Sequence, residues 1–380
     1  METLSFEFPA GQPPKGRALV GVVGSGDLEV LLEPGQPGKL SIQVVTSVNG
    51  ASLRWKHLFE RMFDGQTPPA LSIDIHDFGA TPGVVRCVWS RVSRRSVMTD
   101  NARLLSQHSF IELGARQRAR ALLDAGSFRE LLGPFDRVMS PWLAMQGVVP
   151  QADDGVVVAK GTVDGLPVVI AAIEGSFQGG SMGEVGGAKM AGALELAAED
   201  NRNGIPTAAI VLLETGGVRL QEANLGLAAI AEIHAAMVDL RQYQPVIGVV
   251  AGSVGCFGGM SIAAGLCSYL LVTQEARLGL NGPQVIEQEA GIEEYDSRDR
   301  PFIWSLTGGE QRFASDLVDG FAADDVADIR QQVSGWLKQG VPATHRSGQY
   351  ELFLQCLASL DTEPQIDPHS VRTLYQGARS

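Results

Sequence analysis

The sequence predicts a small α+β domain followed by a larger α/β domain whose sheet is covered on both faces. The length of 380 residues leaves room for two domains, because one domain usually takes roughly 100–200 residues. The first ninety residues hold short strand patterns with one helix among them, whereas apolar runs and helical patterns alternate later. With 44% hydrophobic and 19% charged residues, the composition is that of a globular protein.

The first domain is expected to span residues 1–90. Its sharpest feature is Gly24-Ser25-Gly26-Asp27, which predicts a hairpin turn with the Ser25 hydroxyl at an exposed tip. Either Ser25 is only a turn residue, or its exposed hydroxyl has a chemical role. Alternating or apolar runs predict strands at residues 4–8, 18–23, 28–32, 40–45 and 71–75, and the apolar positions of residues 51–63 predict a helix.

Residues 91–100 are expected to be a linker. Arg91, Arg94 and Arg95 cluster there in an otherwise acidic protein, and a basic run between domains is usually solvated. The segment from 101 to about 145 predicts helices, with residues 115–123 and 128–132 as their centres.

The second domain is expected to span residues 101–340, with a partly helical tail at 341–380. The run Ala208–Leu213 is continuously apolar, as in a strand that is buried on both faces. The remaining patterns predict a β-pair at 155–160 and 168–174, strands at 246–251 and 269–273, and helices at 183–199, 223–240, 258–266, 284–289 and within 301–337.

Three glycine-rich segments follow predicted strands and precede predicted helices, at 175–183, 215–217 and 255–260. Glycine has no side chain to shield its amide, so a carbonyl oxygen can approach the backbone at a helix N-terminus. Gly216 and Gly217 therefore outline an oxyanion hole, although an ordinary strand-to-helix turn fits the same residues. The three segments meet only if their strands are neighbours in the sheet.

Charge and composition disfavour several classes of protein. A formal net charge of −13 argues against general nucleic-acid or anionic-membrane binding. The sequence has no signal peptide and no apolar run of about 18 residues, so we expect a cytoplasmic protein without a membrane span. The four cysteines form no pair in sequence and the histidines lack metal-ligand spacing, so we expect reduced thiols and no metal.

A serine hydrolase is the rival enzyme class. Gly179-Gly180-Ser181-Met182-Gly183 fits the G-x-S-x-G pattern of a nucleophile elbow, with His345 or His369 later in the chain. The pattern is short, so it also occurs by chance. No P-loop and no G-x-G-x-x-G after a strand is present.

Residues 101–340 resemble the carboxyltransferase branch of the crotonase superfamily (ClpP/crotonase fold). Phe177-Gln178-Gly179-Gly180-Ser181-Met182-Gly183 is similar to its F-M-G-G-S-M-G segment. Residues 215–222 are similar to its S-G-G-A-R-M-Q-E turn, and residues 282–288 to its G-P-R-V-I-E-Q segment. The four-cysteine zinc module of the bacterial acetyl-CoA carboxylase β subunit has no counterpart here.

From about residue 98 the chain more closely resembles the β subunit of biotin-independent malonate decarboxylase. Residues 1–90 resemble the acyl carrier (δ) subunit of the same complex, whose serine in a G-S-G-D turn carries a phosphoribosyl-dephospho-CoA arm, and Ser25 occupies that position. The resemblance thus implies two subunits joined in one chain. A natural fusion and a product of readthrough or frameshift remain alternatives.

The resemblance implies a malonyl-S-acyl-carrier-protein decarboxylase, a carbon–carbon lyase that converts a malonyl thioester on the arm to an acetyl thioester and CO₂ without biotin or metal. By the same resemblance, Gly216 and Gly217 are the expected amide donors, Gly258 and Gly259 form a second pair, and Gly179, Gly180 and Ser181 border the arm. A non-catalytic carrier and scaffold is the alternative.

The implied partners are a homologous γ subunit, the α (acyl-carrier transferase) subunit and a prosthetic-group transferase. The chain has one crotonase-like domain where such active sites need two, so the γ subunit is expected to supply one wall. We expect the edge of that interface at Ala263, Ala264, Leu266 and Leu271.

Overall fold

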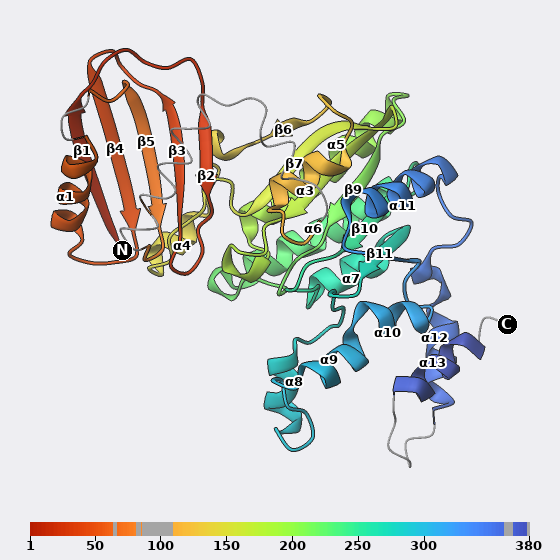
Figure 1. Cartoon of the computed structure of the whole chain (residues 1–380). Coiled ribbons are helices and arrows are strands. Elements are labelled where there is room, and N and C mark those ends of the chain that lie inside the picture. Colours follow the sequence, from red (N-terminus) through yellow and green to blue (C-terminus); the bar gives the residue numbers. More distant parts are fainter. Residues whose placement is uncertain (64–66, 81–84, 86–108, 361–367, 378–380) are drawn as a thin grey trace. The chain divides into compact units, whose positions relative to one another are not determined.

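The computed structural model describes residues 1–63, 67–80, 85, 109–360 and 368–377, which pack as two compact units (Figure 1). The expected linker at 91–100, its three arginines and Cys87 lie outside the described residues, so the expected domain boundaries stay a prediction. The first unit comprises Met1–Gln107, Leu132–Asp154 and Ser176–Gln178, and the second comprises His108–Leu131, Gly155–Gly175 and Gly179–Ser380.

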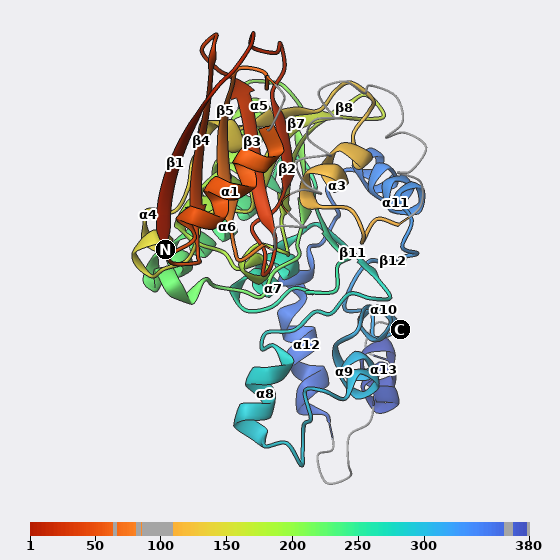
Figure 2. The same ribbon diagram turned by 60° about the vertical axis from the view of Figure 1, so that its left-hand side comes forward.

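The first unit is built on a five-stranded sheet in the order β1-β4-β5-β3-β2. Strands β4 and β5 are parallel and the other neighbours are antiparallel. Helix α1 (Ser52–Phe63) lies across one face of the sheet (Figure 2), and its Trp55, Leu58 and Phe59 are buried there. The predicted α+β pattern is confirmed, with strands β1 (Glu2–Pro9), β2 (Ala18–Gly21), β3 (Leu28–Pro34), β4 (Lys39–Thr46) and β5 (Leu71–Asp77).

The first unit also contains a segment from beyond the linker, Leu132–Asp154, with the 3₁₀ turn η2 (Pro134–Asp136) and helix α4 (Pro141–Met145). Leu143 and Val149 of this segment form an apolar cluster with Val23, next to the hairpin turn, and with Phe177. The strands of the carrier-like sheet therefore share a core with residues that follow them by more than fifty positions.

Polar contacts reinforce this packing. The buried Glu29 carboxylate accepts a hydrogen bond from the Ala152 amide at 3.1 Å and lies 3.0 Å from Nδ1 of His76. Burial raises the pKa of Glu29, and His76 acts against this shift. At the exposed rim, Arg137 bonds Asp74 and Glu33, with N–O distances of 2.5 and 2.7 Å.

The second unit is built on a seven-stranded sheet in the order β12-β11-β10-β9-β8-β7-β6. The five strands from β8 to β12 are parallel, and β7 and β6 continue the sheet in antiparallel fashion. The strands are β6 (Arg129–Leu131), β7 (Val156–Val163), β8 (Leu166–Ile173), β9 (Ala208–Leu212), β10 (Val246–Val250), β11 (Tyr269–Thr273) and β12 (Gly320–Ala322).

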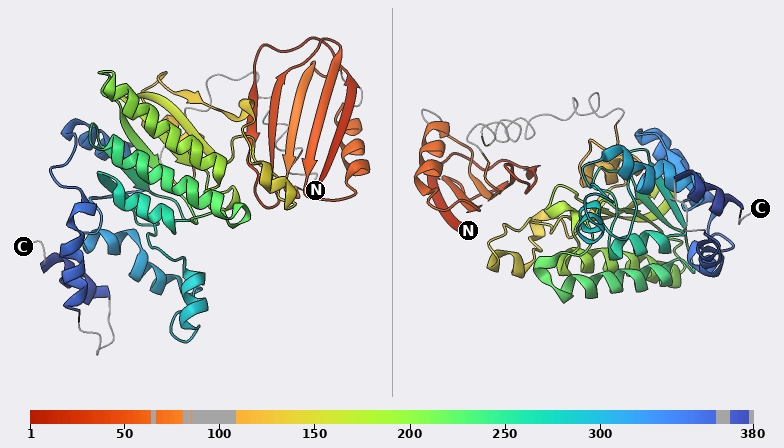
Figure 3. Two further views of the ribbon diagram at one scale, coloured as in Figure 1. Left: turned by 180° about the vertical axis from the view of Figure 1, so that it is seen from behind. Right: turned by 90° about the horizontal axis from the view of Figure 1, so that it is seen from below.

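Helices cover both faces of this sheet (Figure 3). Side chains alternate between faces along a strand, so Ala209 and Val211 of β9 join one core while Ile210 and Leu212 join the other. One face is covered by α5 (Glu184–Arg202), α6 (Asn224–Leu240) and α7 (Gly259–Leu266), and the other by α3 (Ala115–Leu122) and α11 (Val326–Gln339). The other helices are α8 (Pro283–Ala290), α9 (Arg300–Thr307), α10 (Gly309–Ala314), α12 (Tyr350–Ala358) and α13 (Pro368–Gly377).

The helices expected within 301–337 are confirmed as α9, α10 and α11, with the short strand β12 between the last two. Two other expectations about the second domain are wrong. Residues 128–132 form no helix but contain strand β6, which pairs with β7. Ala263, Ala264 and Leu271 are fully buried in the core, so they form no exposed edge; Leu266 is partly buried.

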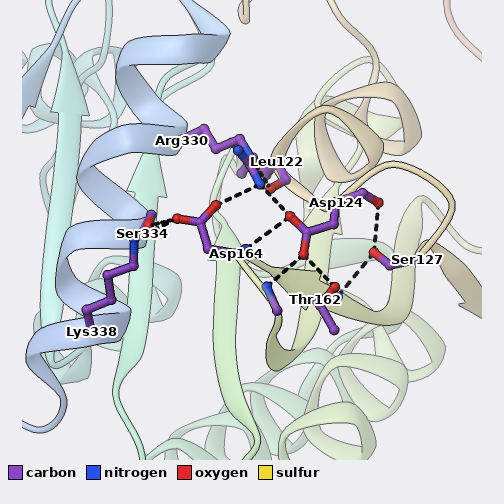
Figure 4. A network of polar contacts seen from close by, with 9 residues as sticks. Leu122, Asp124, Ser127, Thr162, Asp164, Arg330, Ser334 and Lys338 are labelled. Atoms are coloured by element: carbon purple, nitrogen blue, oxygen red, sulfur yellow. Dashed lines mark hydrogen bonds and ion pairs between the residues drawn. The ribbon is translucent and has the colours of Figure 1, made fainter.

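A polar network joins three elements of the second unit (Figure 4). Asp124, after α3, accepts hydrogen bonds from Thr162 and from the backbone of the β7–β8 turn. Asp164 in that turn bonds Ser334 and Lys338 of α11, and Arg330 bonds both aspartates. These bonds lower the pKa of Asp164 to about 2. The network ties α11 to the turn between β7 and β8.

Candidate active site

The three glycine-rich segments leave neighbouring parallel strands. Strands β8, β9 and β10 are adjacent, so their carboxyl ends lie at one edge of the sheet. Beyond that edge the segments pair again through parallel bridges from Met182 to Val218 and from Thr215 to Cys256. The strands that precede the three segments are thus neighbours in the sheet, and the segments meet as this arrangement requires.

Three of the four amides expected to bind an oxyanion already have acceptors. Gly216 donates to the Gly179 carbonyl at 2.9 Å, and Gly258 donates to the Leu280 carbonyl at 2.7 Å. The Gly217 amide donates to Oγ1 of Thr215 at 3.0 Å. The first of these bonds joins the first two segments, and all three bonds argue against Gly216, Gly217 and Gly258 as donors to a substrate.

Two other amides lack an acceptor among the described residues, those of Val218 and Gly259. Met182 bonds the Gly217 carbonyl and the Arg219 amide, so the Val218 amide between them points to the opposite side of the chain. Gly259 is the first residue of α7, where helical amides have no intrahelical partner. Sequence reasoning found Gly259 but missed Val218, because the free amide depends on the bridge to Met182.

The second and third glycine segments touch at Gly217 and Gly258. Both glycines have positive φ angles, 109° and 60°, which disfavour any side chain. A Cβ placed on Gly217 would lie 3.3 Å from Gly258 Cα, and one placed on Gly258 would lie 3.8 Å from the Val218 nitrogen. Glycine at both positions therefore allows the second and third segments to approach each other at the residues that precede Val218 and Gly259.

A buried ion pair supports the first two segments. Arg219 donates to Glu222 at 2.9 Å and to the Ser181 carbonyl at 3.0 Å. The other oxygen of Glu222 accepts the amide of Glu184, the first residue of α5. Such pairs are costly to break because one charge is then left buried. The R-x-x-E spacing at 219–222 was visible in the sequence, but we assigned it no role.

Glu214 supports the third segment in a similar way. Its carboxylate pairs with the Arg118 guanidinium, which also donates to the Phe110 carbonyl at 2.9 Å. The Val254 amide lies 3.4 Å from the other Glu214 oxygen. The pair anchors the segment that follows β10 to helix α3, on the opposite face of the sheet.

Ser25 lies in a hairpin turn, as predicted. The Asp27 amide donates to the Gly24 carbonyl at 2.9 Å, and Gly26 has a φ of 79°, as in a type II turn. The turn is anchored to the end of β5, because Gly26 and Asp27 both bond the Phe78 backbone. Ser25 itself is exposed, so its hydroxyl is presented on a defined turn in the first unit.

The geometry around Ser181 does not favour a hydrolase. A nucleophile elbow strains the serine itself, but here the positive φ angles fall on Gln178, Gly179 and Gly180, not on Ser181. In the described part of the chain, neither His345 nor His369 forms a hydrogen bond with Ser181. Ser181 contributes its backbone carbonyl, which accepts from Arg219. Gly179 is exposed and Gly180 is buried against the Glu214 carbonyl.

The described cysteine thiols are buried, and the described residues provide no metal site. Cys256, Cys267 and Cys356 are buried free thiols, and burial raises the pKa of Cys267 to about 12. Across the described residues, no cluster of histidine, cysteine or acidic side chains is arranged to hold a metal ion. No described helix combines the length and apolar character needed to cross a membrane.

Each of the two parts of the chain matches a known protein family. Residues 15–92 match the malonate decarboxylase delta subunit (MdcD), and residues 106–348 match the carboxyl transferase domain. The malonate decarboxylase acyl carrier protein of Pseudomonas savastanoi pv. phaseolicola is 99% identical over 86 residues, which cover 23% of this chain and 87% of that protein.

Two further comparisons concern the longer part. The malonyl-S-ACP:biotin-protein carboxyltransferase MADC of Malonomonas rubra is 38% identical over 245 residues, which cover 62% of this chain and 77% of that protein. A crystal structure of a Pseudomonas malonate decarboxylase hetero-tetramer in complex with malonate includes a similar chain. Its sequence identity is 73% and its TM-score 0.70, with coverage of 73% of this chain and 100% of that chain.

The fold is that of a carboxyltransferase of the crotonase type. Because the family match extends over more than half of the chain, the chain belongs to the carboxyl transferase family, here preceded by an acyl carrier domain of malonate decarboxylase. The resemblance stated from the sequence is confirmed for both parts.

Proposed function

We propose that this chain decarboxylates a malonyl thioester carried on a prosthetic arm at Ser25, as the β subunit and carrier of a malonate decarboxylase. Loss of CO₂ breaks the bond between the carboxylate and the methylene carbon. The electron pair moves into the thioester and leaves an enolate with its charge on oxygen. Protonation of the methylene carbon then gives an acetyl thioester.

The observation that supports this proposal is the pair of free amides of Val218 and Gly259. An enolate oxygen needs donors that are in place before the charge develops, and each such donor is worth about 10²–10³ in rate. Neither a metal nor a carboxylate dyad is required for this step. We assign Val218 and Gly259 as the donors, in place of Gly216, Gly217 and Gly258.

The arm that we propose is phosphoribosyl-dephospho-CoA on the Ser25 hydroxyl. The match to an acyl carrier domain indicates a covalently attached prosthetic group. Ser25 lies between Gly24 and Gly26 in an exposed turn that is anchored by backbone hydrogen bonds. Gly179, Gly180 and Ser181 of the first glycine segment are proposed to border the bound arm. We propose that the chain acts in the cytoplasm, where its described thiols would stay reduced.

The proposed partners are the homologous γ subunit, the α subunit and a prosthetic-group transferase. Large apolar side chains next to the glycine segments support a partner surface: Leu220 is 80% exposed, Leu280 62% and Ile262 of α7 50%. Exposed apolar side chains on neighbouring segments are typical of subunit interfaces. This set replaces Ala263, Ala264 and Leu271 as the expected edge.

The test is conversion of the arm itself. The chain is co-purified with the γ subunit, its arm is loaded with a malonyl group, and intact mass spectrometry follows the arm without biotin. We expect the mass of the arm to fall by one CO₂ in the presence of γ and far more slowly in its absence. A malonyl arm that stays unchanged with γ present would contradict the proposal and favour a carrier and scaffold.

Carboxyl transfer is the second candidate function, favoured by the 38% identity to the Malonomonas carboxyltransferase. In that reaction the carboxyl group is passed to biotin instead of being released. The same experiment separates the two functions, because transfer requires an added biotin carrier protein and decarboxylation proceeds without one.

A further inference from the structure

Two arginines lie close together beside the third glycine segment without a carboxylate partner. The Arg277 carbonyl accepts the Cys256 amide at 2.8 Å, so Arg277 adjoins that segment directly. Among the described residues, neither Arg277 nor Arg300 forms an ion pair, although the protein has a net charge of −13. Glu275, two residues before Arg277, pairs with neither of them.

Aromatic rings hold the two guanidinium groups. The Arg277 guanidinium lies 4.6 Å from the Trp304 ring centre and 5.5 Å from that of Phe257. Arg300 lies 5.9 Å from the same Trp304 ring. Stacking on aromatic faces is a typical setting for an arginine that receives an anion, because the ring holds the flat group while its N–H donors stay available.

Two buried donors in this cluster have no partner. Nε of Arg277 is buried without an acceptor, while Nη2 of the same guanidinium donates to the Ser253 carbonyl at 2.7 Å. The hydroxyl of Tyr295, a residue only 7% exposed, also lacks a hydrogen bond. Unsatisfied buried donors cost free energy, and at a functional site they often receive a ligand.

The electrostatics agree with this geometry. Burial lowers the pKa of Arg277, the nearby charge of Arg300 lowers it further, and Tyr295 acts in the opposite direction. An anion between the two guanidinium groups would relieve their repulsion.

We propose that Arg277 and Arg300 bind an oxyanion of the carrier-borne substrate. This inference rests on the proposed function. Two sources of the oxyanion share the same chemistry: the free carboxylate of the malonyl group and a phosphate of the arm. Both present several acceptor oxygens to the two guanidinium groups and to the Tyr295 hydroxyl.

The test uses the full chain with Ser25→Ala, so that no arm occupies the site. Malonate, inorganic pyrophosphate and dephospho-CoA are titrated separately by isothermal calorimetry. Binding of malonate would identify the malonyl carboxylate as the source, whereas binding of pyrophosphate or dephospho-CoA would identify a phosphate. Absence of binding by all three would overturn the proposal.

Variants assign the binding to these arginines. We expect Arg277→Gln to raise the dissociation constant of the bound anion by about tenfold or more. Because Arg300 is exposed, we expect Arg300→Ala to raise it by about threefold to tenfold. Arg298→Ala is the matched control, since Arg298 is exposed on the same segment but already pairs with Asp296. Normal binding by Arg300→Ala, or an equal loss in Arg298→Ala, would refute the assignment.

A thermal melt accompanies each titration, and Arg300→Ala decides the outcome if Arg277→Gln fails to fold. The measurement requires no turnover. Failure of the proposed decarboxylation would therefore leave a measured binding site intact, while an active chain whose arginine variants bind normally would contradict only this inference.

Discussion

At the scale of single residues, Ser25 combines exposure with a defined backbone. Its turn is held by the bonds of Gly26 and Asp27 to Phe78, and these bonds do not involve the serine side chain. We therefore expect Ser25→Ala to fold normally and to lose the mass of the arm. Intact mass and a melting curve check both statements. Ser52→Ala, at another exposed serine of the same sheet domain, should keep the arm. An unchanged arm mass in Ser25→Ala would show that attachment occurs elsewhere.

Gly217 is the residue at which a single methyl group should disturb catalysis. Alanine there would have an unfavourable φ of 109° and would press on Gly258 Cα at 3.3 Å, next to the amide donors. We expect Gly217→Ala to lower kcat by about 10²–10³ with a smaller change in KM.

The control for Gly217→Ala is Gly204→Ala. Gly204 also has a positive φ, 82°, but a Cβ there meets no atom within 4 Å. Both variants carry backbone strain, so both should melt earlier, and only Gly217→Ala should lose kcat. Equal kcat values for the two variants would show that the contact between the two glycine segments does not contribute to catalysis.

At the scale of elements, the sequence predicted what depends on local pattern. Ala208–Leu213 was predicted as a doubly buried strand because every position is apolar, and the structure places the residues of β9 (Ala208–Leu212) in two cores. Strands β6 and β12 have only three residues each, too few for periodicity to separate a strand from a helix.

The site was predictable in outline and not in detail for a similar reason. The glycine segments were visible in the sequence, but whether an amide is free depends on partners such as the Leu280 carbonyl, which the fold brings from another segment. Arg277 and Tyr295 were not singled out, because their missing partners appear only after packing.

The network of Asp124 and Asp164 predicts acid sensitivity at the far end of the sheet. Bonds from Lys338 and Ser334 hold the pKa of Asp164 at about 2, below its unfolded value. A carboxylate with a lowered folded pKa stabilises the fold above its unfolded pKa, and this contribution is lost as the pH falls towards about 2. We expect Asp164→Asn to lower Tm at pH 7 and the difference from the parent to shrink on acidification.

Melting curves of the two proteins between neutral and acidic pH check this prediction. Glu232→Gln, at an exposed carboxylate of α6 that makes no ion pair with other described residues, is the control and should leave Tm nearly unchanged. A Tm difference for Asp164→Asn that stays constant over the acidic range would show that the aspartate acts by something other than its charge.

At the scale of the whole molecule, the packing of the first unit does not follow the family boundaries. The carrier match ends at residue 92, yet its sheet shares a core with Leu132–Asp154, which lies inside the carboxyl transferase match. The contacts of Glu29 with Ala152 and of Arg137 with Asp74 and Glu33 join the two matched parts without involving residues 91–100.

We accordingly expect the two parts to stay together when the chain is cut. A protease site introduced within residues 91–100 and cleaved in the folded protein should yield two fragments that co-elute on gel filtration. Leu143, Val149 and Phe177 bury apolar surface against Val23, and the Ala152 amide satisfies the buried Glu29 carboxylate. Fragments that separate at once would show that the linker holds the carrier in place.

A charge reversal identifies the contact that holds the fragments. Arg137→Glu would place a carboxylate beside Asp74 and Glu33, so the dissociation constant of the cut fragments should rise by about tenfold or more. Arg54→Glu makes the same change of charge at an exposed position of α1 and should leave it unchanged. If the two variants dissociate alike, net charge alone governs the association. If only Arg137→Glu dissociates, the carrier domain is held by specific contacts with residues 132–154. The covalent connection through residues 91–100 then raises the local concentration of the carrier but does not define where it binds.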